Sequence, residues 1–326
     1  MKQINWGIIG CGDVTEVKSG PAFQRITNSK LIAVMRRDGA KAKDFAVRHG
    51  VPEWYDDATK ILYHKEINAI YIATPPSSHI EFALKALDIG KDIYLEKPMA
   101  MNAEEAQRIH DAAQRSTGKL VVAHYRRRLP VFRKVKELLE QNAIGAVSFA
   151  DITLLQSRNT EFDQNTEQNW RLQPEISGGG YFQDLAPHQL DIMYHFFGGV
   201  TNVIGFSNRR HTTDGVADMV NGIIHFENGI QFRGIWNFNA AVQDQKDECT
   251  IYGSEGTIRF SFFSGSSVSL VSQKNTEVFN FENPKHIQEP MITATVDYFL
   301  NKDENPCPSA DGAFVMNLMD KISQND

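Results

Sequence analysis

The stretch Ile4-Asn-Trp-Gly-Ile-Ile-Gly10-Cys11-Gly12-Asp13-Val14-Thr15 decides the fold of the first third of the chain. An apolar run, Ile4–Ile9, ends in glycines at the first two positions of a Gly-x-Gly-x-x-Gly pattern, and Thr15 replaces the third glycine. The first glycine allows a tight turn and the second lets the backbone approach a pyrophosphate. The helix that follows offers free N–H groups to the anion. We therefore predict dinucleotide binding by Gly10, Cys11, Gly12, Asp13 and Val14, with looser helix–strand packing at Thr15.

Further apolar runs extend this pattern along the chain, at Lys30–Met35, Ala69–Ala73, Asp92–Leu95 and Leu120–Ala123. Helical spacing separates them at Ser77–Leu87, and Asn102 with Glu105 resembles a capping box at the start of another helix. Strands that alternate with helices predict a doubly wound parallel sheet. We assign residues 1–123 to a Rossmann dinucleotide-binding domain.

The rhythm changes to alternation of apolar and polar residues after a predicted helix at Leu129–Gln141. Period-two patterns predict strands at Val147–Leu155, Gly222–Phe226 and Gln231–Asn237. Shorter strand-like runs follow, and a helix is predicted at Asp184–Phe197. Two further helices are predicted near Ile287–Leu300 and Ala313–Ile322. We assign residues 124–326 to an α+β domain with a mostly antiparallel sheet, for substrate binding and oligomerisation. Its final helices are candidates to pack back on the first domain.

Composition narrows the class of protein. The 326 residues include 41% hydrophobic and 23% charged residues and carry a formal net charge of −6, which argues against a nucleic-acid partner. The chain shows neither a secretory signal nor an apolar run of about 18 residues that could span a bilayer. Its three cysteines are scattered and form no disulfide or metal framework. We expect a cytoplasmic protein with no membrane partner and no metal in its site.

The end of the second strand reads Val34-Met35-Arg36-Arg37-Asp38 and bears on the choice of nicotinamide cofactor. An acidic residue there would bind the ribose 2′-hydroxyl of NAD, whereas arginine accommodates the 2′-phosphate of NADP. Because a guanidinium can pair bidentately with phosphate, Arg36 and Arg37 favour NADP, with NAD as the alternative. In the other interpretation, Arg37 stacks on the adenine and Asp38 caps the next helix.

Several motifs together resemble the glucose–fructose oxidoreductase / inositol dehydrogenase / rhizopine-catabolism (Gfo/Idh/MocA) family over essentially the whole chain. Besides the glycine turn, they are Ala73-Thr74-Pro75-x-x-x-His79, Glu96-Lys97-Pro98, Trp170-Arg171 and Gly178-Gly-Gly-x-x-x-Asp184-x-x-x-His188-x-x-Asp191. The resemblance implies that Thr74, Pro75, Glu96 and Lys97 line the nicotinamide ribose and that Trp170 and Arg171 reach toward the cofactor. It also implies a cis Lys97–Pro98 bond. We include His79 and His124 among the cofactor-binding residues.

Asp184 and His188 are four residues apart in a helical pattern and therefore share a face. Hydride transfer to or from a carbinol carbon requires a group that exchanges the hydroxyl proton. We assign this role to His188, with Lys97 stabilising the reacting oxygen and Asp184 orienting His188 or binding a substrate hydroxyl. The resemblance equally allows Lys97 to be the acid/base group. His195 is interpreted as structural, and Asp191 as either an acceptor for N–H groups or a packing anchor.

The substrate itself stays open among plain, amino or phosphorylated sugars, inositols and cyclic diols. Tyr125 and Arg126 are candidate substrate contacts with Lys97, Asp184 and His188, whereas Arg127 and Arg128 are interpreted as a solvated basic turn. The polar segment Gln156–Gln173 is a candidate wall of the substrate site.

Two other functions compete with a sugar or polyol dehydrogenase. One is an NAD-dependent glycosidase of the same family architecture, and the other is a non-catalytic dinucleotide-binding sensor. The presence of Lys97, Asp184 and His188 together argues against the sensor, and Arg36-Arg37 argues against the glycosidase. The resemblance also implies a homodimer or tetramer, formed through the broad face of the antiparallel sheet.

Overall fold

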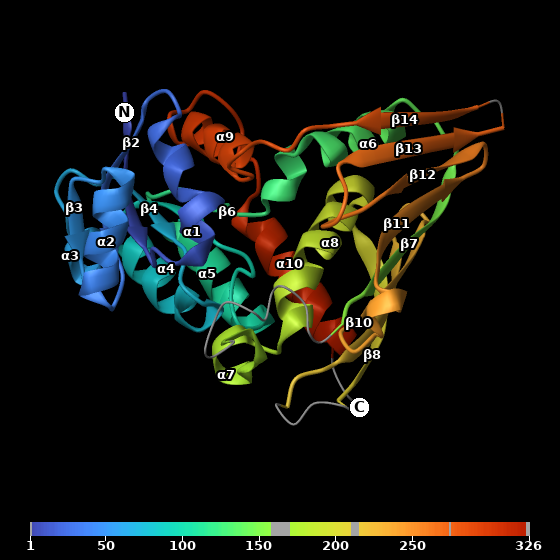
Figure 1. Ribbon diagram of the computed structural model, residues 1–326, viewed down its shortest axis with the longest axis horizontal. Coiled ribbons are helices and arrows are strands. Elements are labelled where there is room, and N and C mark those ends of the chain that lie inside the picture. The colour runs from blue at the N-terminus through green and yellow to red at the C-terminus, as the bar shows by residue number, and fades with distance from the viewer. Residues whose placement is uncertain (1, 158–169, 210–214, 274, 324–326) are drawn as a thin grey trace. The chain divides into compact units, whose positions relative to one another are not determined.

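Strand β1 (Ile4–Ile9) carries the glycine turn at its carboxyl end and lies inside a six-stranded sheet of order β3-β2-β1-β4-β5-β6. The computed structural model describes residues 2–157, 170–209, 215–273 and 275–323 (Figure 1). Every neighbouring pair in this sheet is parallel. The other strands are β2 (Ser29–Met35), β3 (Glu53–Tyr55), β4 (Ala69–Ile72), β5 (Asp92–Leu95) and β6 (Leu120–Val122). The strand order reverses beside β1, and at such switch points open α/β sheets bind ligands.

The helices between these strands confirm the alternating pattern. They are α1 (Asp13–Val17), α2 (Gly39–His49), α3 (Ala58–Leu62), α4 (His79–Asp88) and α5 (Ala103–Arg115), together with the short 3-10 turns η1 (Gly20–Gln24) and η2 (Pro76–Ser78). Asn102 caps α5 by accepting a hydrogen bond from the Glu105 N–H at 2.9 Å. The Glu105 carboxylate accepts in return from the Met101 N–H, one residue before the position that a standard capping box uses.

The chain divides into two compact units, each defined by the contacts among its own residues. The first comprises Met1–Arg126 with Pro284–Phe314, and the second comprises Arg127–Asn283 with Val315–Asp326. Helix α9 (Glu289–Phe299) therefore belongs with the parallel sheet, although it is far from that sheet in sequence. The last boundary between the units falls within helix α10 (Ser309–Ser323), between Phe314 and Val315.

The second unit is built on an eight-stranded sheet of order β14-β13-β12-β11-β7-β10-β9-β8 (Figure 1). Its strands are β7 (Val147–Leu155), β8 (Val200–Asn208), β9 (Met219–Phe226), β10 (Gln231–Asn237), β11 (Lys246–Gly253), β12 (Gly256–Phe260), β13 (Ser267–Ser272) and β14 (Thr276–Asn280). Only β7 and β10 pair in parallel, which confirms a mostly antiparallel sheet among the described strands. The remaining helices of this unit are α6 (Pro130–Glu140), α7 (Pro174–Ser177) and α8 (Tyr181–Phe197), with the 3-10 turns η3 (Tyr125–Arg128), η4 (Trp170–Leu172) and η5 (Val242–Asp244) nearby.

One face of this sheet is covered by α8, where Phe182 packs edge-on against Trp236 of β10 with ring centroids 5.1 Å apart. Burial alternates along β9 and β10, as the period-two pattern predicts. The opposite face exposes apolar side chains, including Ile204, Phe206 and Ile223. No helix within the described ranges is long and apolar enough to cross a membrane.

Candidate active site

The glycine turn has the backbone that the motif requires. Gly10 has φ of +97°, and a Cβ added there would lie 2.8 Å from the main chain of Ala73 and Thr74. Gly12 has φ of −111°, and a Cβ added there would meet nothing within 4 Å. Gly10 is therefore needed for close packing against the segment after β4, while Gly12 leaves open space above the turn. Thr15 is fully buried and its hydroxyl donates to the Gly12 carbonyl at 2.6 Å, so the substituted position packs inside the turn.

At the end of β2 the two arginines and the aspartate have different surroundings. Arg36 is half-buried, and its Nη1 lies 3.5 Å from the carbonyl oxygen of Cys11 in the glycine turn. Arg37 is exposed. Asp38 is the N-cap of α2 and accepts from the Lys41 N–H at 3.1 Å, as one of the two interpretations of this residue expects. Arg36 thus contacts the glycine turn.

His79 joins the two segments that follow β4 and β5. It is fully buried, with Nε2 2.7 Å from the Thr74 carbonyl oxygen and Nδ1 3.0 Å from the Pro98 carbonyl oxygen. Burial, the larger effect, lowers the pKa of His79, while contacts with the carbonyl oxygens oppose that shift. The structure therefore places this side chain beneath the loops that carry Thr74, Pro75 and Lys97.

Glu96 and Lys97 follow β5 at the carboxyl edge of the sheet. The Lys97–Pro98 peptide bond is cis, as the resemblance implies. Glu96 is buried, and its Oε1 accepts from the Tyr71 hydroxyl at 2.5 Å and from Gln288 Nε2 at 2.7 Å. Its Oε2 accepts from the Lys97 N–H at 3.1 Å, while the Lys97 side chain is half-buried. Three neutral donors hold this carboxylate next to the lysine.

The segment after β6 is mostly buried. His124, Tyr125 and Arg126 are buried, and the Arg126 guanidinium lies 5.4 Å from the Tyr125 ring centroid. Arg127, which we interpreted as solvated, is also buried. It donates to both oxygens of Asp191 at 2.6 to 3.1 Å. That interpretation of Arg127 was wrong, because the basic run contains the partner of a buried carboxylate on α8; Arg128 is only half-buried.

Helix α8 presents the second group of candidate residues. Its entry uses three glycines, Gly178 to Gly180, with φ of +86°, +150° and +89°, a backbone that favours glycine. Asp184 Oδ2 accepts from Arg171 Nε at 2.9 Å, and Arg171 lies 4.8 Å from the Trp170 ring centroid. His188 is 4% exposed and packs edge-on against Phe263. The alternatives left open for Asp191 resolve in favour of an acceptor, since it binds Arg127.

Part of the predicted substrate wall, residues 158–169, lies outside the described residues. Trp170 and Arg171 at its end are described and form the cation–π pair above Asp184. In the second unit the structure thus brings together Trp170, Arg171 and Asp184 as one group, and Arg127 and Asp191 as another. In the first unit it brings together the glycine turn, Arg36, Thr74, His79, Glu96 and Lys97.

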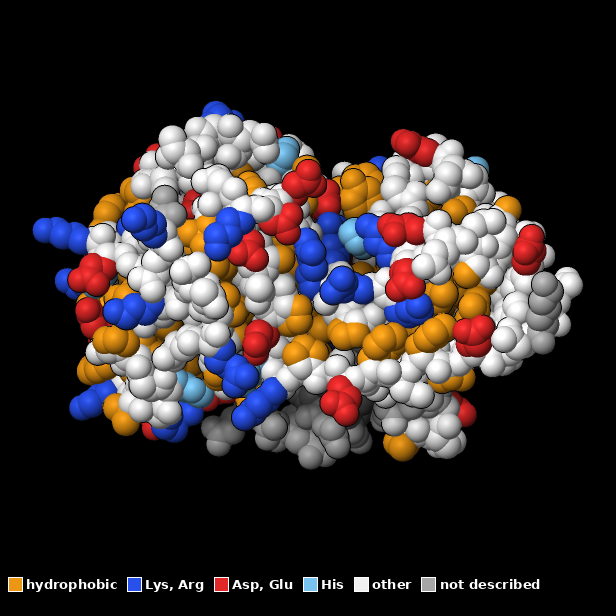
Figure 2. Space-filling model, turned by 90° about the horizontal axis from the view of Figure 1, so that it is seen from above, with side chains coloured by type: hydrophobic (Ala, Val, Ile, Leu, Met, Phe, Trp, Pro, Cys, Tyr) orange, Lys and Arg blue, Asp and Glu red, His pale blue; other side chains and the backbone are white. Residues whose placement is uncertain are grey.

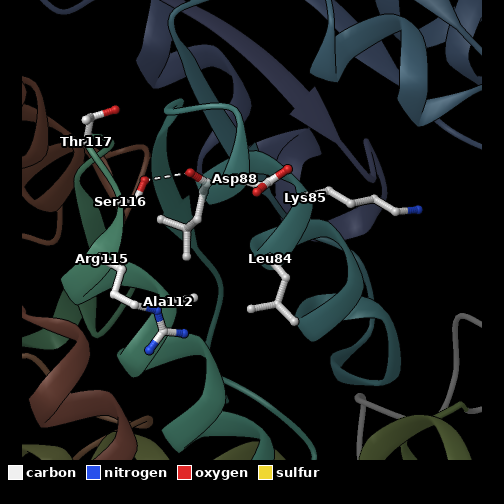
Figure 3. Close-up of a pocket in the computed structure, with 8 residues that line it drawn as sticks. Leu84, Lys85, Asp88, Ala112, Arg115, Ser116 and Thr117 are labelled. Atoms are coloured by element: carbon white, nitrogen blue, oxygen red, sulfur yellow. Dashed lines mark hydrogen bonds between the residues drawn. The ribbon is translucent and has the colours of Figure 1, made fainter.

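A separate pocket lies between α4 and α5 and is lined by Leu84, Asp88, Ala112, Arg115, Ser116 and Thr117 among others (Figure 3). Ser116 Oγ donates to the Leu87 carbonyl at 2.6 Å at its rim. The end of α4 precedes β5, so this pocket is at the edge where the strands begin, opposite their carboxyl ends. We do not include it in the candidate site.

Comparison with known proteins identifies the family. Residues 4–124 match the family described as "Oxidoreductase family, NAD-binding Rossmann fold", and residues 132–259 match the "GFO/IDH/MocA C-terminal domain". The chain is 52% identical over 318 residues to "Oxidoreductase P35" of Formosa agariphila, covering 98% of each chain. The protein is a Gfo/Idh/MocA oxidoreductase. This Gfo/Idh/MocA chain is also 29% identical to levoglucosan dehydrogenase of Pseudarthrobacter phenanthrenivorans, over 80% of its own length and 74% of the relative's.

Solved structures share the fold of this Gfo/Idh/MocA protein. Levoglucosan dehydrogenase in complex with NADH and levoglucosan superposes with a TM-score of 0.85 at 23% identity, covering 98% of this chain and 96% of the other. An oxidoreductase from Agrobacterium radiobacter in complex with NAD+, L-tartaric acid and magnesium gives 0.84 at 20% identity, covering 98% and 95%. These structures confirm the fold class, while the family matches confirm the resemblance found from the sequence motifs and the oxidoreductase class.

Sequence reasoning missed the residues that hold Glu96 in this Gfo/Idh/MocA protein, either directly or, for Tyr94, through Gln288. Tyr71 and Tyr94 look like ordinary apolar members of buried strands, and Gln288 lies in a segment with no motif. The only signal available was their polar atoms, since a hydroxyl on a fully buried strand must find a partner.

Proposed function

We propose that this protein transfers a hydride between a nicotinamide cofactor and a carbinol or carbonyl carbon of a sugar, inositol or related cyclic polyol. The observation that carries the proposal is the position of Glu96 and Lys97 at the carboxyl end of β5, in the same unit as the glycine turn. Membership of an NAD-binding oxidoreductase family supports the cofactor. The levoglucosan dehydrogenase relative supports a carbohydrate substrate.

The residues around the switch point fit a dinucleotide. The open space above Gly12 leaves room for a pyrophosphate beside Gly10, Cys11, Asp13 and Val14. Thr74, Pro75, Glu96 and Lys97 are proposed to line the nicotinamide ribose, with His79 acting through the loops that it joins. His124, Trp170 and Arg171 complete the proposed cofactor contacts. When bound, the nicotinamide supplies the redox chemistry, and the protein supplies orientation and proton exchange.

NADP is the proposed preference, with NAD as the alternative. Asp38 caps α2 through the Lys41 N–H, as the other interpretation expects, so the preference rests on the two arginines. Arg36 lies over the glycine turn and Arg37 is exposed, so both guanidinium groups are available to a 2′-phosphate. Dissociation constants for NADPH and NADH test this preference. The proposed preference would be contradicted if the wild type bound NADPH and NADH with equal dissociation constants and Arg36→Ala left both constants unchanged.

Lys97 and His188 are the proposed acid/base groups, with Asp184, Tyr125 and Arg126 as further substrate contacts. His188 is buried beside Phe263, on the same helix as Asp184. Asp184 is held by Arg171 and so presents a fixed carboxylate on the same helix. Lys97→Ala and His188→Ala are each expected to lose about 10²- to 10⁴-fold in turnover while still binding the cofactor.

The decisive experiment follows nicotinamide absorbance while the protein is incubated with NADPH or NADH and a panel of keto-sugars, or with the oxidised cofactors and polyols. The proposal expects net cofactor turnover with at least one of these substrates. Cofactor binding without turnover, or glycoside cleavage without net change of the cofactor, would favour the sensor or the glycosidase. Full turnover in both Lys97→Ala and His188→Ala would exclude the proposed site.

We also propose a cytoplasmic homo-oligomer that packs through the open face of the eight-stranded sheet. Ile204 pairs with Ile223 across β8 and β9, with exposed fractions of 53% and 54%, and Phe206 is 65% exposed. Exposed apolar groups on one sheet face are typical of a subunit interface. Light scattering on the wild type and on Ile223→Asp tests this: a wild-type monomer would contradict the proposal.

A further inference from the structure

Gln288 lies outside both segments that match the family, at the N-cap of α9, yet it contacts the residue next to the proposed catalytic lysine. It is fully buried. Its Nε2 donates to Glu96 Oε1 at 2.7 Å, and its Oε1 accepts from the Tyr94 hydroxyl at 2.9 Å. We propose that Gln288 is a positioning residue that orients the Glu96 carboxylate, and with it the Lys97 main chain, for the nicotinamide half of the cofactor.

The network gives the Gln288 amide only one satisfactory orientation. Burial, with the nearby Glu96 charge as the next cause, raises the pKa of Tyr94 well above its usual range, so this hydroxyl stays protonated and can donate. The Glu96 carboxylate can only accept, so it takes the amide nitrogen of Gln288, and the amide oxygen is left to accept from the Tyr94 hydroxyl. A flipped amide would face Glu96 with an acceptor. Tyr94 therefore holds Gln288 in the orientation that Glu96 requires.

Glu96 receives its second side-chain donor, Tyr71, on the same oxygen. Burial and the Glu96 charge likewise raise the pKa of Tyr71, which keeps the Tyr71 hydroxyl protonated, and this hydroxyl lies 3.1 Å from Ser19 Oγ. With Tyr71 and Gln288 on Oε1 and the Lys97 N–H on Oε2, the carboxylate has little freedom to rotate. Charge-assisted hydrogen bonds of this kind are stronger than neutral ones.

The same segment also ties the start of α9 to the end of α1. The Gln288 N–H donates to the Lys18 carbonyl at 3.1 Å, and His286 Nδ1 lies 2.6 Å from the Val17 carbonyl oxygen. The backbone of residues 17–19 follows the glycine turn directly. These contacts use the main chain of residue 288 and the side chain of His286, so a side-chain substitution at Gln288 leaves them in place and removes only the bond to Glu96 and the bond to Tyr94.

The inference rests on the proposed dinucleotide site, and its test uses binding rather than turnover. Dissociation constants are measured by titration calorimetry for NADH and NADPH, and for ADP and 2′-phospho-ADP, which lack the nicotinamide ribose. Gln288→Met is expected to weaken binding of the preferred full dinucleotide by about tenfold or more, as for loss of one hydrogen bond to a charged group. Binding of the matching truncated nucleotide is expected to change less than about twofold, because the adenosine half does not contact Glu96.

Thr295→Val is the matched control. Thr295 is fully buried on the same helix, and its hydroxyl donates to the Met291 carbonyl at 2.9 Å. The Thr295→Val variant should lower thermal stability without changing the dissociation constant for the full dinucleotide or for the truncated nucleotide. If Gln288→Met does not fold, Tyr71→Phe removes the other side-chain donor to the same oxygen and is expected to give the same selective loss.

The outcomes distinguish failure of the proposed function from failure of the positioning role of Gln288. A wild-type protein that binds none of the four nucleotides would refute the proposed function, and with it this inference. Wild-type binding that Gln288→Met leaves intact, or weakens equally for full and truncated nucleotides, would overturn the positioning role alone. A selective loss absent from Thr295→Val supports it.

Discussion

Gly10 and Gly12 lie two residues apart but face different surroundings. Gly12 has an extended backbone that any residue can adopt and open space where its Cβ would be. We predict that Gly12→Ala keeps the stability of the wild type within about 0.5 kcal/mol. It should weaken dinucleotide binding by about tenfold or more, which corresponds to about 1.4 kcal/mol, because the methyl group would occupy the space proposed for the pyrophosphate. Chemical denaturation and a binding titration measure the two effects.

Gly10→Ala is the comparison for this prediction. Its φ of +97° and the 2.8 Å approach to Ala73 and Thr74 should destabilise the fold on the order of 1–3 kcal/mol. Equal losses of stability in both variants would show that the space above Gly12 is not open.

Arg127 and Asp191 form a buried ion pair whose side chains are 4% and 1% exposed. We predict that Arg127→Met destabilises the protein by about 3–5 kcal/mol, because it leaves the Asp191 charge buried without this partner. The double variant Arg127→Met/Asp191→Leu should recover much of that loss, since it removes both charges. Urea denaturation of the two variants measures the difference, and a double variant no more stable than the single one would contradict this account.

At the scale of elements, α8 begins and ends on glycines with nearly the same backbone. Gly180 has φ/ψ of 89°/−154° and Gly198 has 82°/−144°. A Cβ at Gly180 would lie 2.8 Å from Val216 Cβ, whereas one at Gly198 would meet nothing within 4 Å. The two positions therefore separate backbone strain from steric contact.

We predict that both alanine variants carry the backbone cost, on the order of 1–3 kcal/mol. Gly180→Ala should lose about 1–3 kcal/mol more, as for an overpacked core position. Denaturation midpoints give the comparison. Equal losses would mean that Val216 moves aside at little cost.

The whole molecule should lose stability in mild acid. Burial, followed by the nearby Arg127 and Lys136 charges, lowers the pKa of His195 from 6.5 to about 4, and Lys136 Nζ lies 3.1 Å from its Nε2. The unfolded chain binds a proton at His195 below its ordinary pKa, while the folded protein does not until about pH 4. The free energy of unfolding should therefore fall between about pH 6.5 and 4, by up to roughly 3 kcal/mol.

His195→Gln keeps an acceptor for Lys136 and removes the titration. The slope of the free energy of unfolding against pH in this window should decrease in the variant. Glu16 belongs to a lower window: its hydrogen bond with Arg48, the largest cause, holds its pKa at about 2, so that contribution is lost only in stronger acid. An unchanged slope in His195→Gln would assign the acid sensitivity to other groups.

Surface charge has a lesser part in what the molecule recognises. On the face shown in Figure 2, Lys and Arg side chains of the first unit are interspersed with Asp and Glu. The net charge of −6 agrees with this mixture. We therefore expect recognition of the proposed cofactor to depend on local groups such as Arg36 and the glycine turn rather than on an extended field.

The sequence by itself determined the elements whose patterns are local. Ile4–Ile9, Asp92–Leu95, Val147–Leu155 and Gln231–Asn237 are strands with the predicted bounds. Burial on two faces or on one face dictates each residue type along such a strand, so the period is visible in the chain. The strands β3 and β8 escaped prediction, because Glu53–Tyr55 is only three residues long and Val200–Asn208 is interrupted by polar residues and a glycine. The glycine turn and Glu96-Lys97-Pro98 could likewise be recognised from the sequence, because each motif consists of adjacent residues.

Only the tertiary structure decided which distant polar groups meet. Arg127 and Asp191 are 64 residues apart, and Glu96 and Gln288 are 192 apart. No periodicity records such a pair, because each partner alone fits a solvated position as well as a buried one. Folding removes water from both groups at once, and a buried carboxylate must then be paired. The sequence thus indicated the lysine of the proposed site, while the fold selected the residues that hold its neighbour in place.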